Sequence, residues 1–572
     1  MCGIVGIFDL DKQITQQELD HFTDAVAHRG PDGRGTYLGR KIGLGHRRLA
    51  ILDLSNAGQG PMRYCLPNGL EYWITFNGEI YNFLEIRQTL KQQGYQFQTE
   101  TDTEVILAAY IHWNEDCLNY FNGMWAFAIW SVAEEKLFLA RDRFGIKPLY
   151  YTSYQSRFVF ASELKAFLAL SDFTPQLNEE IIPHILNNSF AYEGLFPDSL
   201  MKGVYKLPAG QMITINRRGQ LSLRRWWNTS EHLDYDAIPK NYNEQIEQFH
   251  ALFEDSVRLR MRSDVPTGTA LSGGIDSSAV VCQIADLYQK NTHHLDLSRC
   301  FSDQHACFVA SFPGNLNDET HFAKQVITHT RSKAHYWTFN NEQSVQSLID
   351  SVWAMEDVYG AIAIPIWSLY REMRQNKVFV SLDGHGGDEL LGGYNWYLDW
   401  PISQFDLNLY RDFHATLLPS ILRNYDRCSM AHGIEVRMPI MDYRLVTFAF
   451  SLPIEAKMGG GFTKRIFRDS MTGIMPENIR TRRSKMGFNS PMTEWFNDGF
   501  IPVIEYIVNH RLWLESPYWD GPKLREWILR KSYTRSWTYD DWNTSLGIWT
   551  YMNLVLWQLL FIEKIDKEKL QF

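Results

Sequence analysis

The sequence predicts two domains: a strand-rich domain of mixed α and β structure, then an α/β domain built on a parallel sheet. Three observations support this prediction. The chain has 572 residues, which is more than one hydrophobic core normally supports. Short strand-like runs bounded by turn residues fill the first 225 residues. Beyond residue 243, strand-like and helical segments alternate, as they do when helices cover a parallel sheet.

The first predicted domain, residues 1–225, begins with the apolar and β-prone run Met1–Phe8. A helix is predicted over Asp102–His112, because apolar residues recur there at helical spacing. Runs rich in β-branched and aromatic residues predict strands at Glu71–Phe76, Trp125–Trp130, Lys136–Ala140, Leu149–Thr152, Arg157–Ala161 and Gln211–Asn216. The last of these runs is expected to end the domain, before a polar linker at residues 228–243.

The second predicted domain, residues 226–572, starts with a helix over Tyr242–Met261. A strand at Thr269–Leu271, a glycine-rich turn and a helix at Ser277–Tyr288 follow, and two more strands are predicted at Cys307–Phe312 and Lys377–Leu382. Residues after about 400 read as mainly helical, and the apolar run Leu554–Ile562 is interpreted as a buried C-terminal helix.

The composition argues against nucleic-acid-binding, disulfide-bonded and membrane-spanning proteins. The net charge of −10 lacks the basic excess that nucleic-acid binding needs. Seven cysteines without a CxxC pair indicate reduced thiols and a cytoplasmic protein. No basic segment followed by an apolar one opens the chain, and no apolar run is expected to span a bilayer. We therefore expect neither a nucleic acid nor a membrane as partner.

Cys2 follows Met1 directly. If Met1 is removed, a thiol and a free α-amine lie on one residue. The amine has an ordinary pKa near 8, so it can accept the proton of the thiol at neutral pH. The alternative is that Cys2 is a small apolar residue in a first strand.

Four motifs follow Cys2 in a fixed order: His28-Arg-Gly-Pro-Asp-Gly, His46-Arg-Arg-Leu, Phe76-Asn-Gly-Glu-Ile-Tyr-Asn and Thr101-Asp-Thr-Glu. Together with the opening MCGIVGIF, they resemble the glutaminase domain of class II, N-terminal-nucleophile glutamine amidotransferases over residues 1–215. The resemblance implies an αββα sandwich, glutamine as a substrate and Cys2 as the nucleophile.

The same resemblance implies a role for each matching residue. Arg48 would pair with the α-carboxylate of glutamine, and Asp102 and Glu79 would lie in the same glutamine site, Asp102 accepting from the ammonium. The Asn77 amide and the Gly78 backbone N–H would form the oxyanion hole. The alternatives are a surface ion pair for Arg48, a helix N-cap for Asp102 and a hairpin turn for Asn77-Gly78.

A second motif lies at residues 271–278, Leu-Ser-Gly-Gly-Ile-Asp-Ser-Ser, between a predicted strand and a predicted helix. Small residues let successive backbone N–H groups point into one concavity, where the helix N-terminus favours an anion. No GxxxxGK[ST] loop occurs in the chain. The motif resembles the pyrophosphate-binding loop of ATP pyrophosphatases. The alternative is a glycine-rich turn capped by Asp or Ser.

This resemblance implies ATP and Mg²⁺ as ligands. Asp276 and Asp388 would hold the metal ion. The residues implied in ATP binding are Leu271, Ser272, Gly273, Gly274, Asp276, Ser277, Ala310, Asp383 and Gly384. For Asp383 and Asp388 the alternative is a turn that their side chains stabilise.

Further motifs continue the resemblance, including residues 426–442, DRCSMAHGIEVRMPIMD, then Lys464, Arg468 and the segment 482–488. Lys485 is implied to be the catalytic lysine, placed on the α-phosphate or the developing oxyanion. A solvated basic run is the alternative for Arg482 and Arg483. Four residues are implied near the acceptor substrate: His385, Glu389, Glu435 and Arg437.

A glutaminase followed by such an adenylating domain resembles the glutamine-hydrolysing asparagine synthetase family over nearly the whole chain. The resemblance implies that glutamine, ATP and aspartate are the substrates, that ammonia crosses an internal tunnel, and that a homodimer can form. One residue departs from the family, because His385 stands where the motif Ser-Gly-Asp-Gly or Ser-Gly-Glu-Gly commonly has its acid. The alternatives are therefore an enzyme that amidates another carboxylate, such as a specialised metabolite or a peptide, and a non-catalytic binding subunit.

Overall fold

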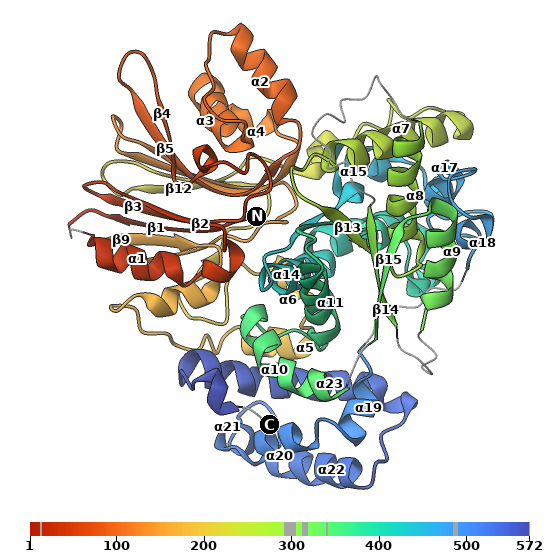
Figure 1. The fold of residues 1–572 in the computed structure, drawn as a ribbon. Helices are drawn as coiled ribbons and strands as arrows, with labels where there is room; N and C mark the ends of the chain where they lie inside the picture. Colours follow the sequence, from red (N-terminus) through yellow and green to blue (C-terminus); the bar gives the residue numbers. More distant parts are fainter. Residues whose placement is uncertain (12–13, 291–304, 312–317, 339–340, 484–489, 571–572) are drawn as a thin grey trace.

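The two halves of the chain fold around different sheets. The computed structural model describes residues 1–11, 14–290, 305–311, 318–338, 341–483 and 490–570, with the side chains of 341–346 left aside. In Figure 1, stacked sheets form the N-terminal half, and a separate sheet with its helices forms the C-terminal half. The predicted architecture, a strand-rich antiparallel part followed by a parallel α/β part, is confirmed.

Two six-stranded sheets stack in the N-terminal half. Their orders are β10-β8-β9-β1-β3-β2 and β12-β11-β7-β6-β5-β4, and every pairing is antiparallel. The strands are β1 (Gly3–Asp9), β2 (Gly33–Leu38), β3 (Ile42–Arg48), β4 (Met62–Cys65), β5 (Glu71–Ile80), β6 (Gly123–Ser131), β7 (Lys136–Arg141), β8 (Tyr150–Tyr154), β9 (Arg157–Ala161), β10 (Tyr205–Lys206), β11 (Gln211–Ile215) and β12 (Leu221–Arg225).

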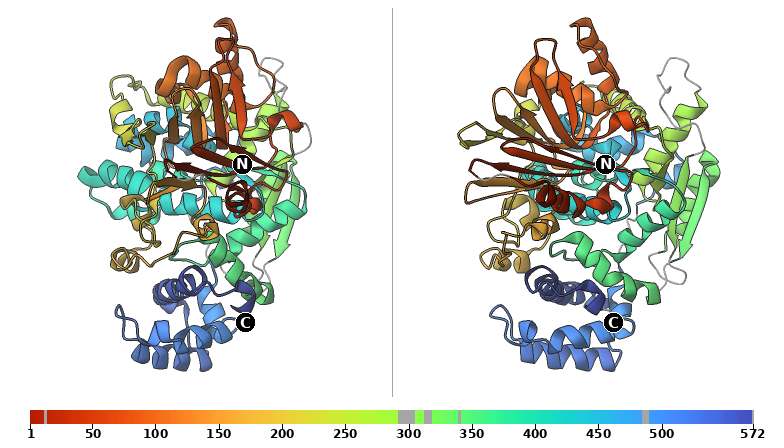
Figure 2. Two further views of the ribbon diagram at one scale, coloured as in Figure 1. Left: turned by 90° about the vertical axis from the view of Figure 1, so that its left-hand side faces the viewer. Right: turned by 60° about the vertical axis from the view of Figure 1, so that its left-hand side comes forward.

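Helices cover the outer faces of both sheets, which gives the four layers α, β, β and α (Figure 2). On one side α1 (Gln16–Asp24) contacts β1, β2 and β3, and on the other α2 (Phe83–Gln92) and α3 (Asp102–Trp113) lie over the second sheet, with α3 against β5. Successive side chains of a strand point to opposite faces. Because both faces are covered, β6 is apolar on each. Ala126, Ala128 and Trp130 lie in the cluster between the sheets, and Trp125, Phe127 and Ile129 lie in the cluster beneath α3.

A five-stranded parallel sheet organises the C-terminal half, in the order β15-β14-β13-β16-β17. The strands are β13 (Thr267–Ala270), β14 (Ala306–Ser311), β15 (Lys333–Thr338), β16 (Val380–Leu382) and β17 (Glu435–Arg437). Helix α8 (Ile275–Gln289) follows β13, and α12 (Gly387–Leu391) follows the neighbouring β16. Parallel neighbours end at the same edge of a sheet, so the turns 271–274 and 383–386 lie side by side.

The strands that were not predicted from the sequence are β2, β3, β4, β10, β12, β15 and β17. The sequence predicts Gln211–Asn216 as the last strand of the first domain, but β12 follows it and pairs with β11. All five residues of β12 are exposed at the sheet edge, and the short run Leu-Ser-Leu-Arg-Arg has no buried apolar face. β15 is mostly exposed or half-buried, and β17 has only three residues. Neither carries the apolar signal of a buried strand.

A helical lobe closes the chain (Figure 1). Its helices are α19 (Met492–Asn497), α20 (Ile501–Asn509), α21 (Arg511–Leu514), α22 (Gly521–Tyr533) and α23 (Trp542–Trp557). Contrary to the expectation from sequence, one helical stretch, Tyr539–Ile562, is long and apolar enough by length and composition to cross a membrane. However, 72% of its apolar window is buried inside the molecule, and Trp549 and Trp557 belong to a core cluster. This helix is therefore the core of the lobe.

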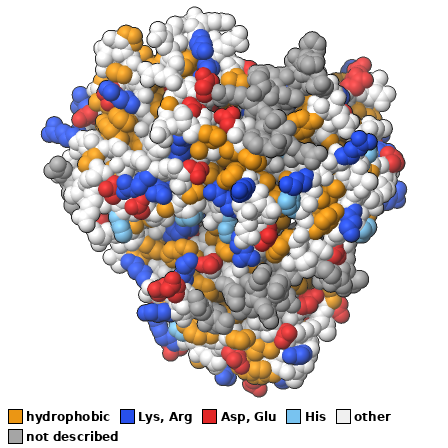
Figure 3. Space-filling model, viewed as in Figure 1, with side chains coloured by type: hydrophobic (Ala, Val, Ile, Leu, Met, Phe, Trp, Pro, Cys, Tyr) orange, Lys and Arg blue, Asp and Glu red, His pale blue; other side chains and the backbone are white. Residues whose placement is uncertain are grey.

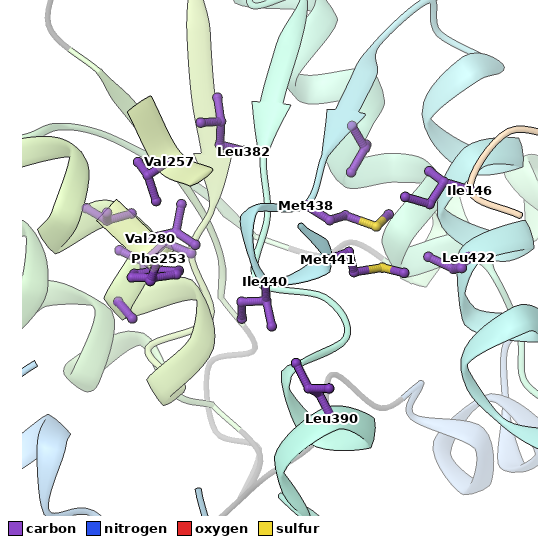
Figure 4. Packing of buried hydrophobic residues seen from close by; sticks show 14 of the residues in the cluster. Ile146, Phe253, Val257, Val280, Leu382, Leu390, Leu422, Met438, Ile440 and Met441 are labelled. Carbon is purple, nitrogen blue, oxygen red and sulfur yellow. The ribbon is translucent and has the colours of Figure 1, made fainter. Parts of the chain in front are cut away.

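One hydrophobic core joins the two halves. Ile146 of the N-terminal half lies in the same cluster as Leu422 and Met438 (Figure 4). The cluster continues to Val257 and Val280 of α7 (Tyr242–Arg260) and α8. On the face drawn in Figure 3, acidic and basic side chains are interspersed, so the net charge of −10 is not gathered there in one patch.

Candidate active sites

Cys2 directly precedes β1, where the N-terminal half meets the C-terminal half. Gly3 pairs with Arg47 of β3, and the Cys2 backbone N–H donates to Asn77 Oδ1 of β5 at 3.1 Å. The amine of Met1 lies 3.0 Å from Glu435 Oε2. With Met1 in place, the nitrogen of Cys2 is a peptide N–H. That it acts as a free amine stays a prediction.

Asn77 and Gly78 lie inside β5, not in a hairpin turn. The hydrogen bond from Cys2 fixes the orientation of the Asn77 amide, and its buried Nδ2 has no hydrogen-bond partner among the described residues. A buried donor without a partner is costly, and a bound oxyanion would satisfy it. At Gly78 a Cβ would stand 2.1 Å from Met124 O, so only glycine fits there.

The Cys2 thiol has a lowered pKa. Burial alone would raise its pKa, but the charge of His46, a hydrogen bond to His46 and the charge of the amino terminus lower the pKa to about 7. A thiol with that pKa is about half ionised at neutral pH, and the thiolate is the nucleophile. The sequence motif contains His46, yet we predicted no role for it.

Arg48 is buried and not part of a surface ion pair. Its guanidinium donates to the backbone carbonyls of Ser55 at 2.7 Å, Leu52 at 3.4 Å and Asp53. These carbonyls fix the guanidinium beside the segment 52–55. The pairing of Arg48 with the carboxylate of glutamine stays a prediction.

Two carboxyl groups, Glu79 and Asp102, are buried near one another. Burial is the main cause that raises the pKa of Asp102 to about 6. For Glu79, burial and the nearby charge of Asp102 raise the pKa well above its usual value. Asp102 Oδ2 accepts from the Ile80 N–H at 2.9 Å, while the N-cap of α3 is Thr101. An arriving ammonium group would stabilise the ionised form of both acids.

In the C-terminal half, the turn 271–274 joins β13 to the first turn of α8. Gly273 has a φ of +79°, in the left-handed region that glycine adopts readily. Ser272 Oγ lies 3.1 Å from Ser277 Oγ and accepts from the Gly274 N–H at 3.2 Å. The N–H groups at the start of a 15-residue helix therefore face the turn, which is an arrangement suited to a phosphate.

Lys464 joins the two carboxylates that the sequence assigns to a metal. Its Nζ lies 2.5 Å from Asp276 Oδ2 and 2.7 Å from Asp388 Oδ1. Burial would lower the pKa of Lys464, but the two carboxylates outweigh it and raise the pKa, so the ammonium stays charged. Lys464 has a φ of +52°, an uncommon conformation for a residue with a side chain.

A cavity of about 360 Å³ opens between these elements. Of the residues predicted to bind ATP, the metal ion or the acceptor, the cavity is lined by Leu271, Ser272, Gly274, Asp276, Ser277, Ala310, Asp383, Gly384, His385, Asp388 and Glu389. Gly273 lies outside this lining. Lys464, Arg468, Arg482 and Arg483 also line the cavity, which concentrates positive charge beside the phosphate turn.

Glu435 and Arg437 do not line this cavity, and their place near the acceptor stays a prediction. Both lie fully buried in β17, where Arg437 Nε donates to Glu435 Oε1 at 2.5 Å and Nη2 lies 3.4 Å from Glu79 Oε2. The N-terminal half supplies Met1 and Glu79 as their partners, so the pair belongs to the junction between the halves.

Lys485 lies outside the described residues, so its predicted role stays a prediction. Lys464 and His46 are the residues that sequence reasoning missed. Both stand in segments whose motifs were noted. Their roles depend on partners that are distant in the sequence: Lys464 and Asp276 are 188 residues apart. A local sequence pattern does not reveal such a partner.

Comparison with known proteins gives a family match for each half of the chain. Residues 1–227 match a family model described as a glutamine amidotransferase domain, and residues 248–406 and 400–558 match one described as asparagine synthase. Glutamine-hydrolyzing asparagine synthetase 1 of Bacillus subtilis (strain 168) is 28% identical over 99% of this chain and 97% of the relative. Asparagine synthetase 3 of the same organism is 31% identical over 84% of this chain and 86% of the relative.

A putative glutamine-hydrolyzing asparagine synthetase 2 of Methanocaldococcus jannaschii is 35% identical over 74% of this chain and 79% of the relative. The asparagine synthase model and the glutamine amidotransferase model together account for nearly all of the sequence. The chain therefore belongs to the asparagine synthase family, with an N-terminal glutamine amidotransferase domain.

Proposed function

We propose that the protein is a glutamine-dependent ligase that releases ammonia at Cys2 and uses it to amidate a carboxylate activated by ATP. One observation carries this proposal. The same chain places a thiol with a pKa near 7 beside Asn77, and a phosphate turn beside a buried lysine and two carboxylates. These two sites correspond to the two halves of the reaction.

In the first half-reaction, the Cys2 thiolate attacks the side-chain carbonyl of glutamine. The oxyanion accepts hydrogen bonds from Asn77 Nδ2 and from the Gly78 N–H. Ammonia leaves, and water hydrolyses the thioester to glutamate. The free thiols of the described cysteines support a reducing compartment, and we place the protein in the cytoplasm.

In the second half-reaction, a carboxylate attacks the α-phosphorus of ATP, and pyrophosphate leaves. The turn 271–274 holds phosphate oxygens through backbone N–H groups. Lys464 and the arginines that line the cavity stabilise the charge that develops on those oxygens. The product is an acyl-adenylate, which ammonia converts to the amide and AMP.

Asp276 and Asp388 fit a divalent cation, because two hard oxygen donors from separate turns already face one positive charge, the ammonium of Lys464. Within the described part of the chain, no group of three His, Cys, Asp or Glu side chains is close enough to hold a metal alone. The remaining ligands would be pyrophosphate oxygens and water. We propose Mg²⁺, which would neutralise charge on the pyrophosphate.

Aspartate is the first candidate acceptor, because the relatives reported above are named asparagine synthetases. His385 on the cavity wall favours a second candidate, a carboxylate of another kind. Pyrophosphate release with a panel of carboxylates separates the two. Release with another carboxylate and none with aspartate would exclude aspartate.

Two variants test the two sites separately. We expect Cys2→Ala to lose glutamine-dependent synthesis while keeping ammonia-dependent synthesis, because the thiol serves only glutamine. We expect Lys464→Gln to lose synthesis from either nitrogen source by at least about 100-fold while keeping glutaminase activity. Amide product and glutamate are measured in each variant.

Lys457→Gln is the matched control, because Lys457 is also buried and ion-paired, at 2.9 Å from Asp406, but does not line the cavity. It should keep both activities. Glutamine-dependent turnover that survives Cys2→Ala would show that another group is the nucleophile.

A further inference from the structure

His385 lies where the acyl-adenylate would form. It lines the cavity and directly follows Gly384. A Cβ on Gly384 would stand 2.5 Å from the backbone carbon of Asp276 and 2.6 Å from the nitrogen of Ser277. The backbone before His385 is thus packed against the phosphate turn and the start of α8, which brings the imidazole beside the site of adenylation.

Asp383 lies beside the His385 ring, whose buried Nε2 has no hydrogen-bond partner among the described residues. His385 Nε2 lies 3.5 Å from Asp383 Oδ2, longer than a good hydrogen bond, as is common for catalytic groups before substrate binds. The Asp383 carboxylate accepts from Ser381 Oγ at 2.6 Å, Tyr370 OH at 2.7 Å and the Ala270 N–H at 3.1 Å. It is therefore fixed and buried.

Asp383 is also ionised. Burial would raise its pKa, but His385, Ser381 and Tyr370 hold the pKa below its usual value. A fixed carboxylate behind one nitrogen of an imidazole keeps a proton on that nitrogen and leaves the other nitrogen as a base. In this chain the second nitrogen is His385 Nδ1.

The helix that packs against His385 also reaches the surroundings of Cys2. The Tyr425 ring of α14 (Leu418–Met430) lies 3.6 Å from the His385 ring, centroid to centroid. The next residue, Asp426, binds Arg29 at 2.9 Å, and Arg29 Nε donates to the Cys2 carbonyl at 3.1 Å. Neighbouring residues of α14 therefore contact the imidazole on one side and, through Arg29, the backbone of Cys2.

Other groups around the cavity are poorly suited to accept a proton. Lys464 is a cation engaged by two carboxylates, Asp276 and Asp388. Burial raises the pKa of Tyr425 well above its usual value, so this hydroxyl is not ionised at neutral pH. Glu389 accepts from Tyr394 OH at 2.6 Å. The His385 imidazole has a ring nitrogen that can accept the proton.

We propose that His385, held by Asp383, is the general base of the amide-forming step. The lone pair of ammonia forms the C–N bond at the acyl carbon. The bond between that carbon and the AMP oxygen breaks, and AMP leaves with the electron pair. One proton moves from the attacking nitrogen to His385 Nδ1 and passes later to solvent. This step deepens the proposed function and depends on it.

The test separates adenylation from amide formation, with aspartate as acceptor. Exchange of pyrophosphate into ATP contains no ammonia, so it reports adenylation alone. Amide formation is measured at a fixed concentration of free NH₃ across pH. We expect His385→Gln to keep exchange and glutaminase within about threefold, and to lose amide formation by about 100-fold or more.

The pH profile identifies the base. In the unmodified protein, amide formation should rise with pH through one inflection to a plateau, because only the unprotonated base accepts the proton. His385→Gln should remove this inflection. Tyr425, whose ring contacts the imidazole, and Tyr370, which donates to Asp383, have pKa values raised well above the usual one, so neither hydroxyl produces this inflection.

His250→Gln is the matched control, since His250 contacts Gln283 at 3.2 Å and does not line the cavity. It should leave the profile unchanged. Two results would overturn the proposal. One is an equal loss of exchange and amide formation in His385→Gln, which would make His385 an acceptor-binding residue. The other is a retained inflection in that variant. The exchange reaction of the unmodified protein tests the proposed function separately.

Discussion

At the residue scale, the charge state of the Cys2 thiol depends on one neighbour. Burial alone would raise the thiol pKa, and His46 is the largest of the groups that instead bring it to about 7. The thiolate is the reactive form, so alkylation of Cys2 should rise as pH increases and reach half its maximum near that pH. In His46→Gln the pKa should increase, and the half-maximum should move upward by about one unit or more.

Iodoacetamide labelling followed by mass spectrometry of the Cys2 peptide measures this shift. Cys65 provides an internal comparison, because it is exposed. The buried thiols of Cys282, Cys307 and Cys428, whose pKa values burial raises, should label slowly in both proteins. An unchanged half-maximum in His46→Gln would remove His46 from the explanation.

The sequence predicts part of each site at this scale. Cys2, Asn77 and Asp276 stand in local motifs, so their neighbourhood in sequence is also their neighbourhood in space. Glu435 and Arg437 also stand in a motif, but the structure places them against Met1 and Glu79, more than 350 residues away. Pairing across the chain is set by how the halves pack, which a local pattern does not encode.

At the element scale, the positions of the two turns depend on a glycine. Gly384 lies so close to the first turn of α8 that an added Cβ would meet backbone atoms of Asp276 and Ser277. Backbone cannot move aside as a flexible side chain does. Gly384→Ala should therefore displace the phosphate turn, lowering pyrophosphate exchange by about tenfold or more, while glutaminase activity is unchanged.

Gly547→Ala is the control at this scale. Gly547 lies within α23 with open space around the added Cβ. Alanine is favoured there over glycine by about 0.5–1 kcal/mol, so the free energy of unfolding should rise slightly and exchange should not change. Full exchange activity in Gly384→Ala would mean that the two turns do not need this close contact.

Prediction of strands succeeded where burial on both faces leaves a long apolar run. β6 is apolar throughout because both of its faces are covered, and the sequence predicts it well. β12 was missed because its five residues are exposed at a sheet edge, and hydrogen bonds to β11 rather than apolar contacts hold it there. Period-based reasoning detects burial and not pairing.

At the scale of the whole molecule, a buried network of charges joins the two halves. Arg29, fully buried in the N-terminal half, binds Glu163 at 2.6 Å and Asp426 of α14 at 2.9 Å. Lys147 lies 3.6 Å from the same Asp426. Such pairs contribute little over an apolar contact, but removing one partner leaves an uncompensated charge. The network therefore makes the two halves depend on each other for stability.

The carboxylates of this network set the response to acid. Burial would raise the pKa of Asp426, but Arg29, Lys147 and Arg427 outweigh it and hold this pKa below its usual value. Burial would likewise raise the pKa of Glu163, but His28, Lys165 and Arg29 hold it well below its usual value. A carboxyl group whose pKa is depressed on folding stabilises the protein above its unfolded-state pKa, and this stabilisation is lost as pH falls through the folded value. The network should therefore stabilise the protein fully above about pH 5, and its contribution should decline as pH falls below about 4.

Arg29→Met should weaken this behaviour in a defined direction. Without the guanidinium, the pKa values of Asp426 and Glu163 rise, so the midpoint of acid unfolding should move to higher pH. At neutral pH the free energy of unfolding should fall by about 3 kcal/mol, because other cations partly compensate. Arg34→Met is the control, since Arg34 makes only exposed pairs with Asp20 and Asp24, which contribute at most about 1 kcal/mol. Equal acid midpoints for the two variants, measured by tryptophan fluorescence and by glutaminase activity, would show that the buried network does not couple the halves.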